Sequence, residues 1–291
     1  MKKIKPVLLA MAVALVFTGC TNIATPEELI EPPELNLEKQ SMKEALEKFL
    51  PEDSTTTALP NLDGVDKEMA FSPIDLNDDG KLEMIAFYKD KNTKLMGMLI
   101  LSNKRDKWEK ISDIKLNSFD ILQFKVLDLD NDKNKEIVLG TYSDESISYG
   151  KKLTILSFKD NKVTSILEMP YAGMALGDLD KDASYEIAIL YQNEEMIENR
   201  LRIMRVAGNK VSRIDEKIFP QGVDPYSIAI GNIYDDEEVI FVDSFSGIYE
   251  GRTDIFFFKD KKIKDIEDYK GFKLSDKSFP VQTPDVDSDG R

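Results

Sequence analysis

The sequence predicts an all-β protein built from a repeated unit of four short strands, with one short helix ahead of the first unit. Two observations carry this prediction. An acidic segment returns along the chain at intervals of about 50 residues, and the stretches between its copies are short runs rich in β-branched and aromatic residues. Internal repetition with this period is typical of folds in which each unit packs on the next.

The acidic segment occurs five times. Its copies read DLNDDGKLEMIAFY from Asp75, DLDNDKNKEIVLGTY from Asp128, DLDKDASYEIAILY from Asp178, NIYDDEEVIFVD from Asn232 and DVDSDG from Asp285. The spacings between these starting points are 53, 50, 54 and 53 residues. So regular an interval indicates one structural unit per copy.

The first expected element is a helix over residues 41–50, with Ser41 as its N-cap and Pro51 after its end. Its apolar residues fall on one face: Met42, Ala45, Leu46, Phe49 and Leu50. We expect this face to pack against the first repeat.

Each repeat is expected to hold four strands. A short apolar stretch such as 124–127 leads into the acidic loop, and a run of β-forming residues follows the loop, at 84–88, 137–142, 187–191 and 239–242. A second run follows at 98–101, 153–158, 201–206 and 255–258, and a charged turn then leads to a third at 104–108, 159–163, 208–211 and 259–263. Four short strands in about 50 residues is the pattern of a β-propeller blade.

The acidic loops have the residue types and spacing of calcium ligands. Oxygen-bearing side chains alternate at positions 1, 3 and 5, position 7 offers its backbone carbonyl, and position 9 is glutamate. The expected ligands are Asp75, Asn77, Asp79, Lys81 and Glu83 in the first loop, Asp128, Asp130, Asp132, Asn134 and Glu136 in the second, and Asp178, Asp180, Asp182, Ser184 and Glu186 in the third. Such alternation brings several oxygens to one hard cation, which relieves their mutual repulsion.

The residues after the loops exclude one class of calcium protein. An EF-hand needs an acidic residue at position 12 and a following helix. Position 12 is Ala86 in the first loop and Leu139 in the second, and both lie in β-forming runs.

A D-x-[DN]-x-D-x-x-x-E loop followed directly by a strand instead resembles the FG-GAP/VCBS repeats of integrin-type β-propellers, over residues 70–291. This resemblance implies a propeller, structural calcium and a role in binding proteins or polysaccharides.

Some positions depart from that pattern. Lys133 and Ala183 stand where the first loop has Gly80, at a turn that glycine fits best. The fourth loop is two residues shorter and offers Asn232, Tyr234 and Asp236, so we expect it to bind calcium poorly or not at all. The alternative for every loop is an acidic turn that is simply solvated. Where calcium binds, we expect it to stiffen a blade and to have no catalytic role.

The number of repeats predicts an incomplete ring. A propeller closes on its first blade so that no strand edge is exposed, and the propellers that this chain resembles typically have about seven blades. Four blades and the start of a fifth at Asp285 therefore indicate part of a longer ring. A four-bladed ring closed by a strand near 278–283 is the alternative.

The N-terminus has the features of a bacterial lipoprotein signal. Three lysines precede an apolar run of 11 residues over 7–17, which is too short to span a bilayer, and Thr18-Gly19-Cys20 resembles a lipobox. We expect residues 1–19 to be removed, Cys20 to carry the diacylglycerol and palmitate anchor, residues 20–40 to form a tether and residues 41–291 to form the repeats. The alternative is an ordinary secretory signal, but Cys20 is the only cysteine of the chain.

Composition narrows the classes of function. The net charge of −15 becomes −18 when the three signal lysines are removed, which argues against nucleic acid as a partner and is compatible with bound divalent cations. The chain has no histidine, so the usual zinc ligand and the commonest general base are both missing.

The sequence therefore predicts an outward-facing, membrane-anchored binding module without catalytic activity, whose partner is an extracellular protein or a polysaccharide. Five tyrosines between the blades are either contact residues or core: Tyr142, Tyr149, Tyr171, Tyr226 and Tyr249. Two alternatives stay open. One is a propeller enzyme that cleaves polysaccharides with a pair of carboxylates, and the other is a purely structural envelope lipoprotein.

Overall fold

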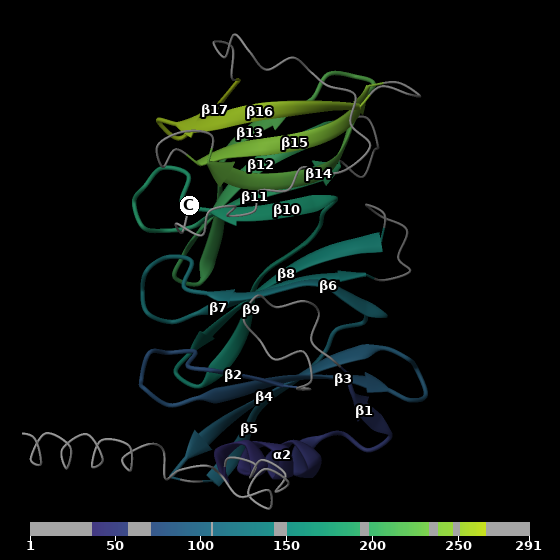
Figure 1. Cartoon of the computed structure of the whole chain (residues 1–291), viewed down its shortest axis with the longest axis vertical. Helices are drawn as coiled ribbons and strands as arrows, with labels where there is room; N and C mark the ends of the chain where they lie inside the picture. Colours follow the sequence, from purple (N-terminus) through teal and green to yellow (C-terminus); the bar gives the residue numbers. More distant parts are fainter. Residues whose placement is uncertain are drawn as a thin grey trace, which may run out of the picture. The chain divides into compact units, whose positions relative to one another are not determined.

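A computed structural model describes residues 37–57, 71–105, 107–142, 150–192, 198–232, 238–246 and 251–265 (Figure 1). The chain divides into two compact units, Met1–Glu44 and Ala45–Arg291. The signal segment, Cys20, Tyr149, Tyr249 and the fifth acidic segment from Asp285 lie outside the described residues. Among the described residues, no helix is long and apolar enough to cross a membrane.

The N-terminal helix, α2 (Leu37–Phe49), begins earlier than the sequence predicts. Ser41 was expected to cap it but lies inside it, because Leu37, Glu38, Lys39 and Gln40 are good helix formers and extend it by a turn. The Gln40 amide donates to Glu44 one turn later. Met42, Ala45 and Leu46 are buried, as the apolar face predicts.

The predicted all-β architecture is confirmed in the described residues, which form four antiparallel sheets with strands in chain order. The first sheet contains β2 (Phe71–Ile74), β3 (Glu83–Asp90), β4 (Met96–Lys104) and β5 (Lys107–Lys115). The second contains β6 (Asp120–Leu127), β7 (Glu136–Tyr142), β8 (Lys151–Lys159) and β9 (Lys162–Pro170). The third contains β10 (Gly173–Gly177), β11 (Glu186–Gln192), β12 (Asn199–Ala207) and β13 (Lys210–Ile218), and the fourth β14 (Val223–Asn232), β15 (Glu238–Ser246), β16 (Gly251–Lys259) and β17 (Lys262–Asp265).

The first sheet has one strand more than the sequence predicts. The short strand β1 (Ser54–Thr56) pairs with the C-terminal half of β3, while β2 pairs with its N-terminal half. The two short strands thus share one edge of β3. A run of three residues carries no periodicity, so the sequence alone does not distinguish β1 from a turn.

The internal geometry of the repeat is preserved from sheet to sheet. The third and fourth strands slip register at the same place in three sheets, after Ile100, Ile155 and Ile203. The glutamate of each acidic loop opens the second strand and faces the last residue of the first strand, as in the pairs of Ile74 with Glu83 and of Leu127 with Glu136. The loops therefore join the first and second strands at one end of each sheet.

Successive sheets share hydrophobic cores. One core combines Phe87 of the first sheet with Phe124 of the second, whose rings meet edge to face at 5.0 Å. A second core joins the second and third sheets around Tyr171, and a third joins the third and fourth sheets around Phe219 and Phe256. Each sheet thus packs on the sheets of the neighbouring repeats.

Candidate metal-binding loops

The first aspartate of each complete loop organises the turn by accepting backbone hydrogen bonds. Asp75 Oδ2 accepts the N–H of Gly80 at 2.8 Å, and its Oδ1 accepts the N–H of Asp79 at 3.2 Å. Asp128 does the same with Lys133 and Asp132, at 2.8 and 3.1 Å, and Asp178 with Ala183 and Asp182, both at 3.0 Å. One turn geometry is therefore built three times.

The same turn needs two residues with left-handed backbone. Position 4 has φ of 57° to 61° in Asp78, Asn131 and Lys181, and position 6 has φ of 80° at Gly80, 75° at Lys133 and 70° at Ala183. The expected poor fit of Lys133 and Ala183 thus has a physical basis, because side chains with a Cβ rarely adopt this conformation. The hydrogen bond from each position-6 N–H to the first aspartate holds the turn in place.

The glutamate at position 9 is buried beneath each loop and is hydrogen-bonded to the start of the same loop. Glu83, Glu136 and Glu186 are almost fully buried, and each accepts the N–H of the leucine at position 2, at 2.9 to 3.1 Å. Those leucines are buried as well: Leu76, Leu129 and Leu179. Burial, together with the nearby charges of Asp130 and Asp132, raises the pKa of Glu136 to about 7 against the lowering effect of the Leu129 N–H. The loop therefore holds more negative charge than its own donors compensate.

The loops of successive sheets are hydrogen-bonded to each other. The N–H of Lys135 in the second loop donates to the carbonyl of Leu76 in the first at 2.8 Å, and Tyr185 in the third donates to Leu129 in the second at 2.9 Å. Gly208, in the turn between β12 and β13, also donates to Asp130. The conformation of one loop therefore affects the position of the neighbouring sheet as well as that of the sheet to which the loop belongs.

In the second and third loops the structure brings together oxygens of three of the five residues that the sequence assigns to each site. Oxygens of Asp128, Asp130 and Glu136 lie within 4.8 Å of one another, and so do oxygens of Asp178, Asp180 and Glu186. Asp130 Oδ1 and Asp180 Oδ1 are buried and have no hydrogen-bond partner. Among the described residues these two groups could hold a metal ion, and their all-oxygen donor sets suit a hard cation such as calcium. The first loop offers the same donor chemistry through Asp75, Asn77, Asp79 and Glu83.

The third loop differs from the other two in one contact. The guanidinium of Arg205, on β12 opposite Glu186, reaches into the loop and contacts three of its expected ligands. At the same place the first and second sheets have Ser102 opposite Glu83 and Ser157 opposite Glu136. The sequence analysis did not single out Arg205, although it lies 19 residues after Glu186, the spacing that separates Glu83 from Ser102.

The fourth loop does not follow the predicted alignment. Asn232, expected at position 1, is the last residue of β14 and pairs with Glu238, as Leu127 pairs with Glu136. It is therefore a strand residue that precedes the loop. Glu238 occupies the place of the buried glutamate, where burial and the charge of Asp178 raise its pKa. Tyr234 and Asp236 lie outside the described residues.

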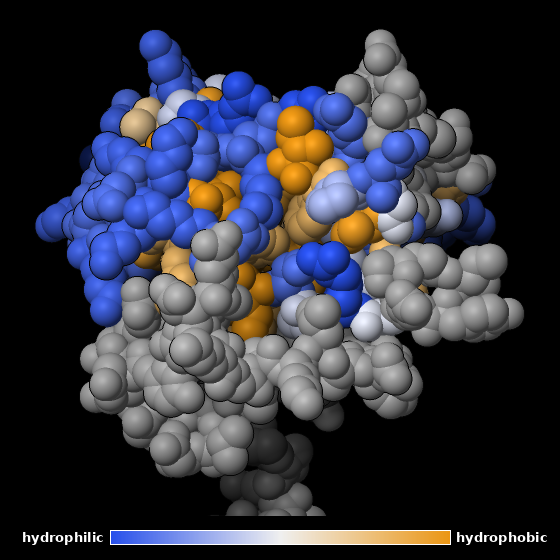
Figure 2. Space-filling view, turned by 90° about the horizontal axis from the view of Figure 1, so that it is seen from above, coloured by the Kyte–Doolittle hydropathy of each residue, from blue (hydrophilic) through white to orange (hydrophobic). Residues whose placement is uncertain are grey.

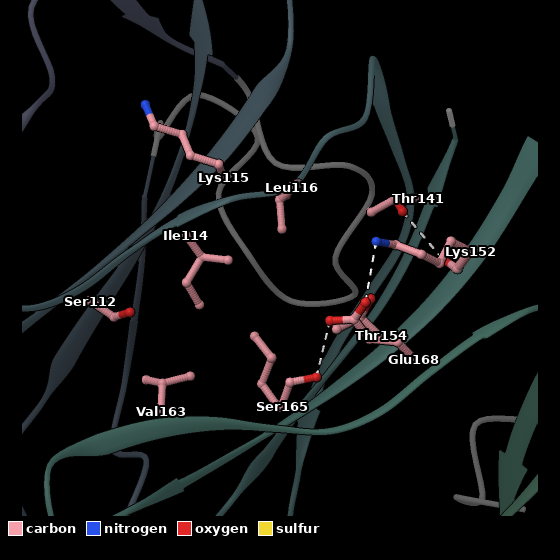
Figure 3. Close-up of a pocket in the computed structure, with 11 residues that line it drawn as sticks. Ser112, Ile114, Lys115, Leu116, Thr141, Lys152, Thr154, Val163, Ser165 and Glu168 are labelled. Carbon is pink, nitrogen blue, oxygen red and sulfur yellow. Dashed lines mark hydrogen bonds and ion pairs between the residues drawn. The ribbon is translucent and has the colours of Figure 1, made fainter. Parts of the chain in front are cut away.

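A cavity of about 250 Å³ lies between the first and second sheets (Figure 3). Ile114 and Leu116 line one side of it, and Lys152 and Glu168 form an ion pair of 3.5 Å at another. Ser165 also donates to Glu168. Lys152, Ser165 and Glu168 are thus bonded to one another at the wall of the cavity.

The ends of the sheets opposite the acidic loops carry exposed apolar side chains. Phe119 and Tyr142 of the second sheet are about 40% exposed, and Phe245 of the fourth sheet stacks on Tyr226 at 4.4 Å. Tyr171, by contrast, is buried and belongs to the core. Figure 2 shows one face of the molecule on which hydrophobic surface is flanked by hydrophilic side chains.

Comparisons with known proteins identify no family. No known family profile matches the chain, and no curated protein sequence matches it. Among solved structures, a rhamnogalacturonan lyase from Bacillus licheniformis aligns with 62% of this chain and 40% of its own, at 18% identity and a TM-score of 0.36. An exotype rhamnogalacturonan lyase aligns with 62% and 38%, at 17% identity and a TM-score of 0.35. The chain thus spans about two fifths of the length of these enzymes, and likeness at this level indicates neither its fold nor its chemistry.

Proposed function

We propose that this chain is an exported, lipid-anchored binding module whose sheets are the blades of an FG-GAP/VCBS-type β-propeller, stiffened by calcium and without catalytic activity. The observation that carries the proposal is the acidic loop itself. Its hydrogen-bond frame, its two left-handed positions and its buried glutamate recur in three sheets.

The electrostatics of the loops support calcium as the stiffening ion. In the second loop four carboxylates surround one turn, Asp130 leaves a buried oxygen unpartnered, and burial keeps the pKa of Glu136 at about 7. A divalent cation among these oxygens would compensate the charge and satisfy the free oxygen. Because the loops are bonded to each other, a cation in one loop would also fix the neighbouring sheet.

The calcium proposal predicts a bound ion that depends on named residues. Titration of the chelator-treated full chain with calcium should show binding, and Asp130→Ala should remove one ion. Phe119→Ala, at the opposite end of the same sheet, serves as the control and should leave the number unchanged. Absence of calcium binding at millimolar concentration would contradict the proposal.

The binding role rests on the opposite ends of the sheets. The exposed ring of Phe245, stacked on the half-buried Tyr226, brings a large contact area at small conformational cost and suits sugar rings or the side chains of another protein. The acidic loops at the other end would keep these ends rigid. The partner that we propose is an extracellular polysaccharide or protein.

An array of glycans and envelope proteins tests this role. The full chain should be retained on at least one glycan or protein, and the double variant Tyr226→Ala, Phe245→Ala should lose most of that retention. Tyr185→Ala, an exposed tyrosine in the third acidic loop, is the matched control. Shortened glycans would indicate the polysaccharide-processing enzyme instead, and no retention at all would favour a structural envelope lipoprotein.

The proposed anchor has its own test. Cells that express the full chain and are fed radiolabelled palmitate should incorporate the label into the protein, and Cys20→Ser should abolish incorporation, because Cys20 is the only thiol of the chain. Labelling that persists in Cys20→Ser would contradict acylation at this residue.

A further inference from the structure

The third acidic loop already contains a cation of its own. Arg205 Nε donates to Glu186 Oε1 at 2.7 Å, Nη1 donates to Asp182 Oδ2 at 2.8 Å, and Nη2 donates to Asp180 Oδ2 at 2.8 Å. These three carboxylates stand at positions 9, 5 and 3, which are the side chains that a calcium ion would share with Asp178. The Arg205 side chain is only 17% exposed, and its partners range from the fully buried Glu186 to Asp182, which is 44% exposed.

The fold places Arg205 there through strand register. Arg205 lies on β12 directly across from Glu186, which opens β11. The equivalent residues are serines, and a serine hydroxyl is neutral: Ser102 donates to Glu83 at 3.1 Å in the first sheet, and Ser157 faces Glu136 in the second. One substitution at a repeated position thus decides whether a loop carries an internal positive charge.

The second loop has no equivalent of this contact among the described residues. Its nearest ion pair joins Lys159 to Asp132 at 3.6 Å, and the lysine side chain is half exposed. Such a pair touches one carboxylate and is screened by solvent, so it leaves Asp128, Asp130 and Glu136 without compensation. Arginine in the third loop instead offers several donors in a rigid fork.

We infer that Arg205 takes the place of the metal ion in the third loop, so that of the three complete loops only the first and second take up calcium. The inference rests on the proposed calcium binding and narrows it. Calcium in the third loop would have to displace a guanidinium that is bonded to three of its ligands, or sit beside a positive charge. The third loop is therefore formed with or without calcium, while the first and second gain their rigidity from the ion.

A matched pair of variants separates the two loops. Asp130→Ala and Asp180→Ala remove the position-3 carboxylate from the second and the third loop. Isothermal calcium titration of the full chain should show one ion fewer for Asp130→Ala and an unchanged number for Asp180→Ala. If Asp180→Ala also loses one ion, the inference about Arg205 is overturned while calcium binding stands. If neither variant loses an ion and the wild type binds none, the proposed function fails instead.

The inference also predicts that removal of Arg205 creates an additional calcium site in the third loop. Arg205→Ser, which installs the residue of the other two sheets, should bind one calcium ion more than the wild type. Arg213→Ser, on the neighbouring strand, removes the same charge from a half-exposed side chain that pairs with Glu216 outside the acidic loop, and it should not change the number. Ser157→Arg should remove one ion from the second loop. A folded Arg205→Ser that binds no additional ion contradicts the inference.

Melting in EGTA gives a readout that does not depend on any bound ion. Without Arg205 the third loop keeps its carboxylates but loses their countercharge, so Arg205→Ser should melt several degrees lower than Arg213→Ser. Calcium should then restore the melting temperature of Arg205→Ser by more than it raises that of the wild type. Equal melting of the two variants in EGTA would overturn the role of Arg205, even if the other loops bind calcium.

Discussion

The residue at position 6 determines how much backbone strain each acidic loop contains. Position 6 is left-handed in all three complete loops, but only the first has glycine there. The second and third loops hold Lys133 and Ala183 in the same conformation through a hydrogen bond to the first aspartate. The position is therefore strained in two loops of the three, and the strain is removable.

Exchanging glycine and alanine at this position should change stability in opposite directions. A Cβ at Gly80 would meet no atom within 4 Å, so Gly80→Ala introduces backbone strain without a clash and should cost about 1 kcal/mol of unfolding free energy. Ala183→Gly relieves the same strain and should stabilise the chain by up to about 1 kcal/mol. Urea denaturation in EGTA measures both, and equal midpoints for the two variants would show that φ at position 6 is not the determinant.

The buried Tyr171 makes the stability of the folded chain depend on pH in the alkaline range. Burial raises the pKa of Tyr171 to about 12, above the ordinary value of 10.0. A raised pKa means that the neutral phenol is favoured in the folded state, so its contribution is fully present below pH 10 and is lost as the pH rises through about 12. The loss amounts to roughly 2 kcal/mol over that range.

Replacement of this tyrosine should therefore flatten the alkaline part of the stability profile. Between pH 9 and pH 12 the unfolding free energy of Tyr171→Phe should fall less than that of the wild type. Tyr142→Phe, at an exposed ring, should follow the wild-type profile. If the unfolding free energies of Tyr171→Phe and the wild type fall equally between pH 9 and pH 12, the buried phenol does not titrate in this range.

At the scale of elements, stability comes from the contacts between successive sheets. Phe124 is buried between the first two sheets and meets Phe87 edge to face. Phe124→Ala should cost about 3 to 5 kcal/mol, because it leaves a cavity between the two sheets. Phe119→Ala, on an exposed ring of the same sheet, should cost well under that in the same denaturant titration. Comparable losses would mean that the two sheets do not depend on this contact.

The elements also show what the sequence could predict. Runs such as 84–88 and 137–142 predict strands because they are rich in β-branched and aromatic residues, which favour strands over helices. Both runs lie in strands of the structure. The loops were predictable in the same way, since alternating aspartates and a glutamate at position 9 occur three times. The helix boundary was missed by four residues, because strong helix formers ahead of Ser41 outweigh its preference for a cap.

Cross-strand neighbours were the part that sequence reasoning missed. The contact of Arg205 with Glu186 depends on the pairing of β11 with β12, and Asn232 changes from a loop residue to a strand residue for the same reason. Register follows from three-dimensional pairing, which a one-dimensional pattern does not contain. Aligning the repeats beyond the acidic loops, so that Ser102, Ser157 and Arg205 coincide, would have exposed the exception.

For the whole molecule, negative charge is the dominant property. The net charge is −15, and three loops each gather at least three carboxylates around a single turn. Close carboxylates repel one another unless a cation lies between them. Arg205 supplies that cation in the third loop, and calcium is proposed to supply it in the first two.

Thermal melting of the full chain in EGTA and in saturating calcium tests the calcium-stiffened repeat most directly. An ion at 100 times its Kd adds about 2.7 kcal/mol per loop, so two loops should raise the melting temperature by on the order of 10 °C. Asp130→Ala should lose part of this increase. A melting temperature that is the same in EGTA and in calcium would contradict the proposal and leave the acidic loops as solvated turns.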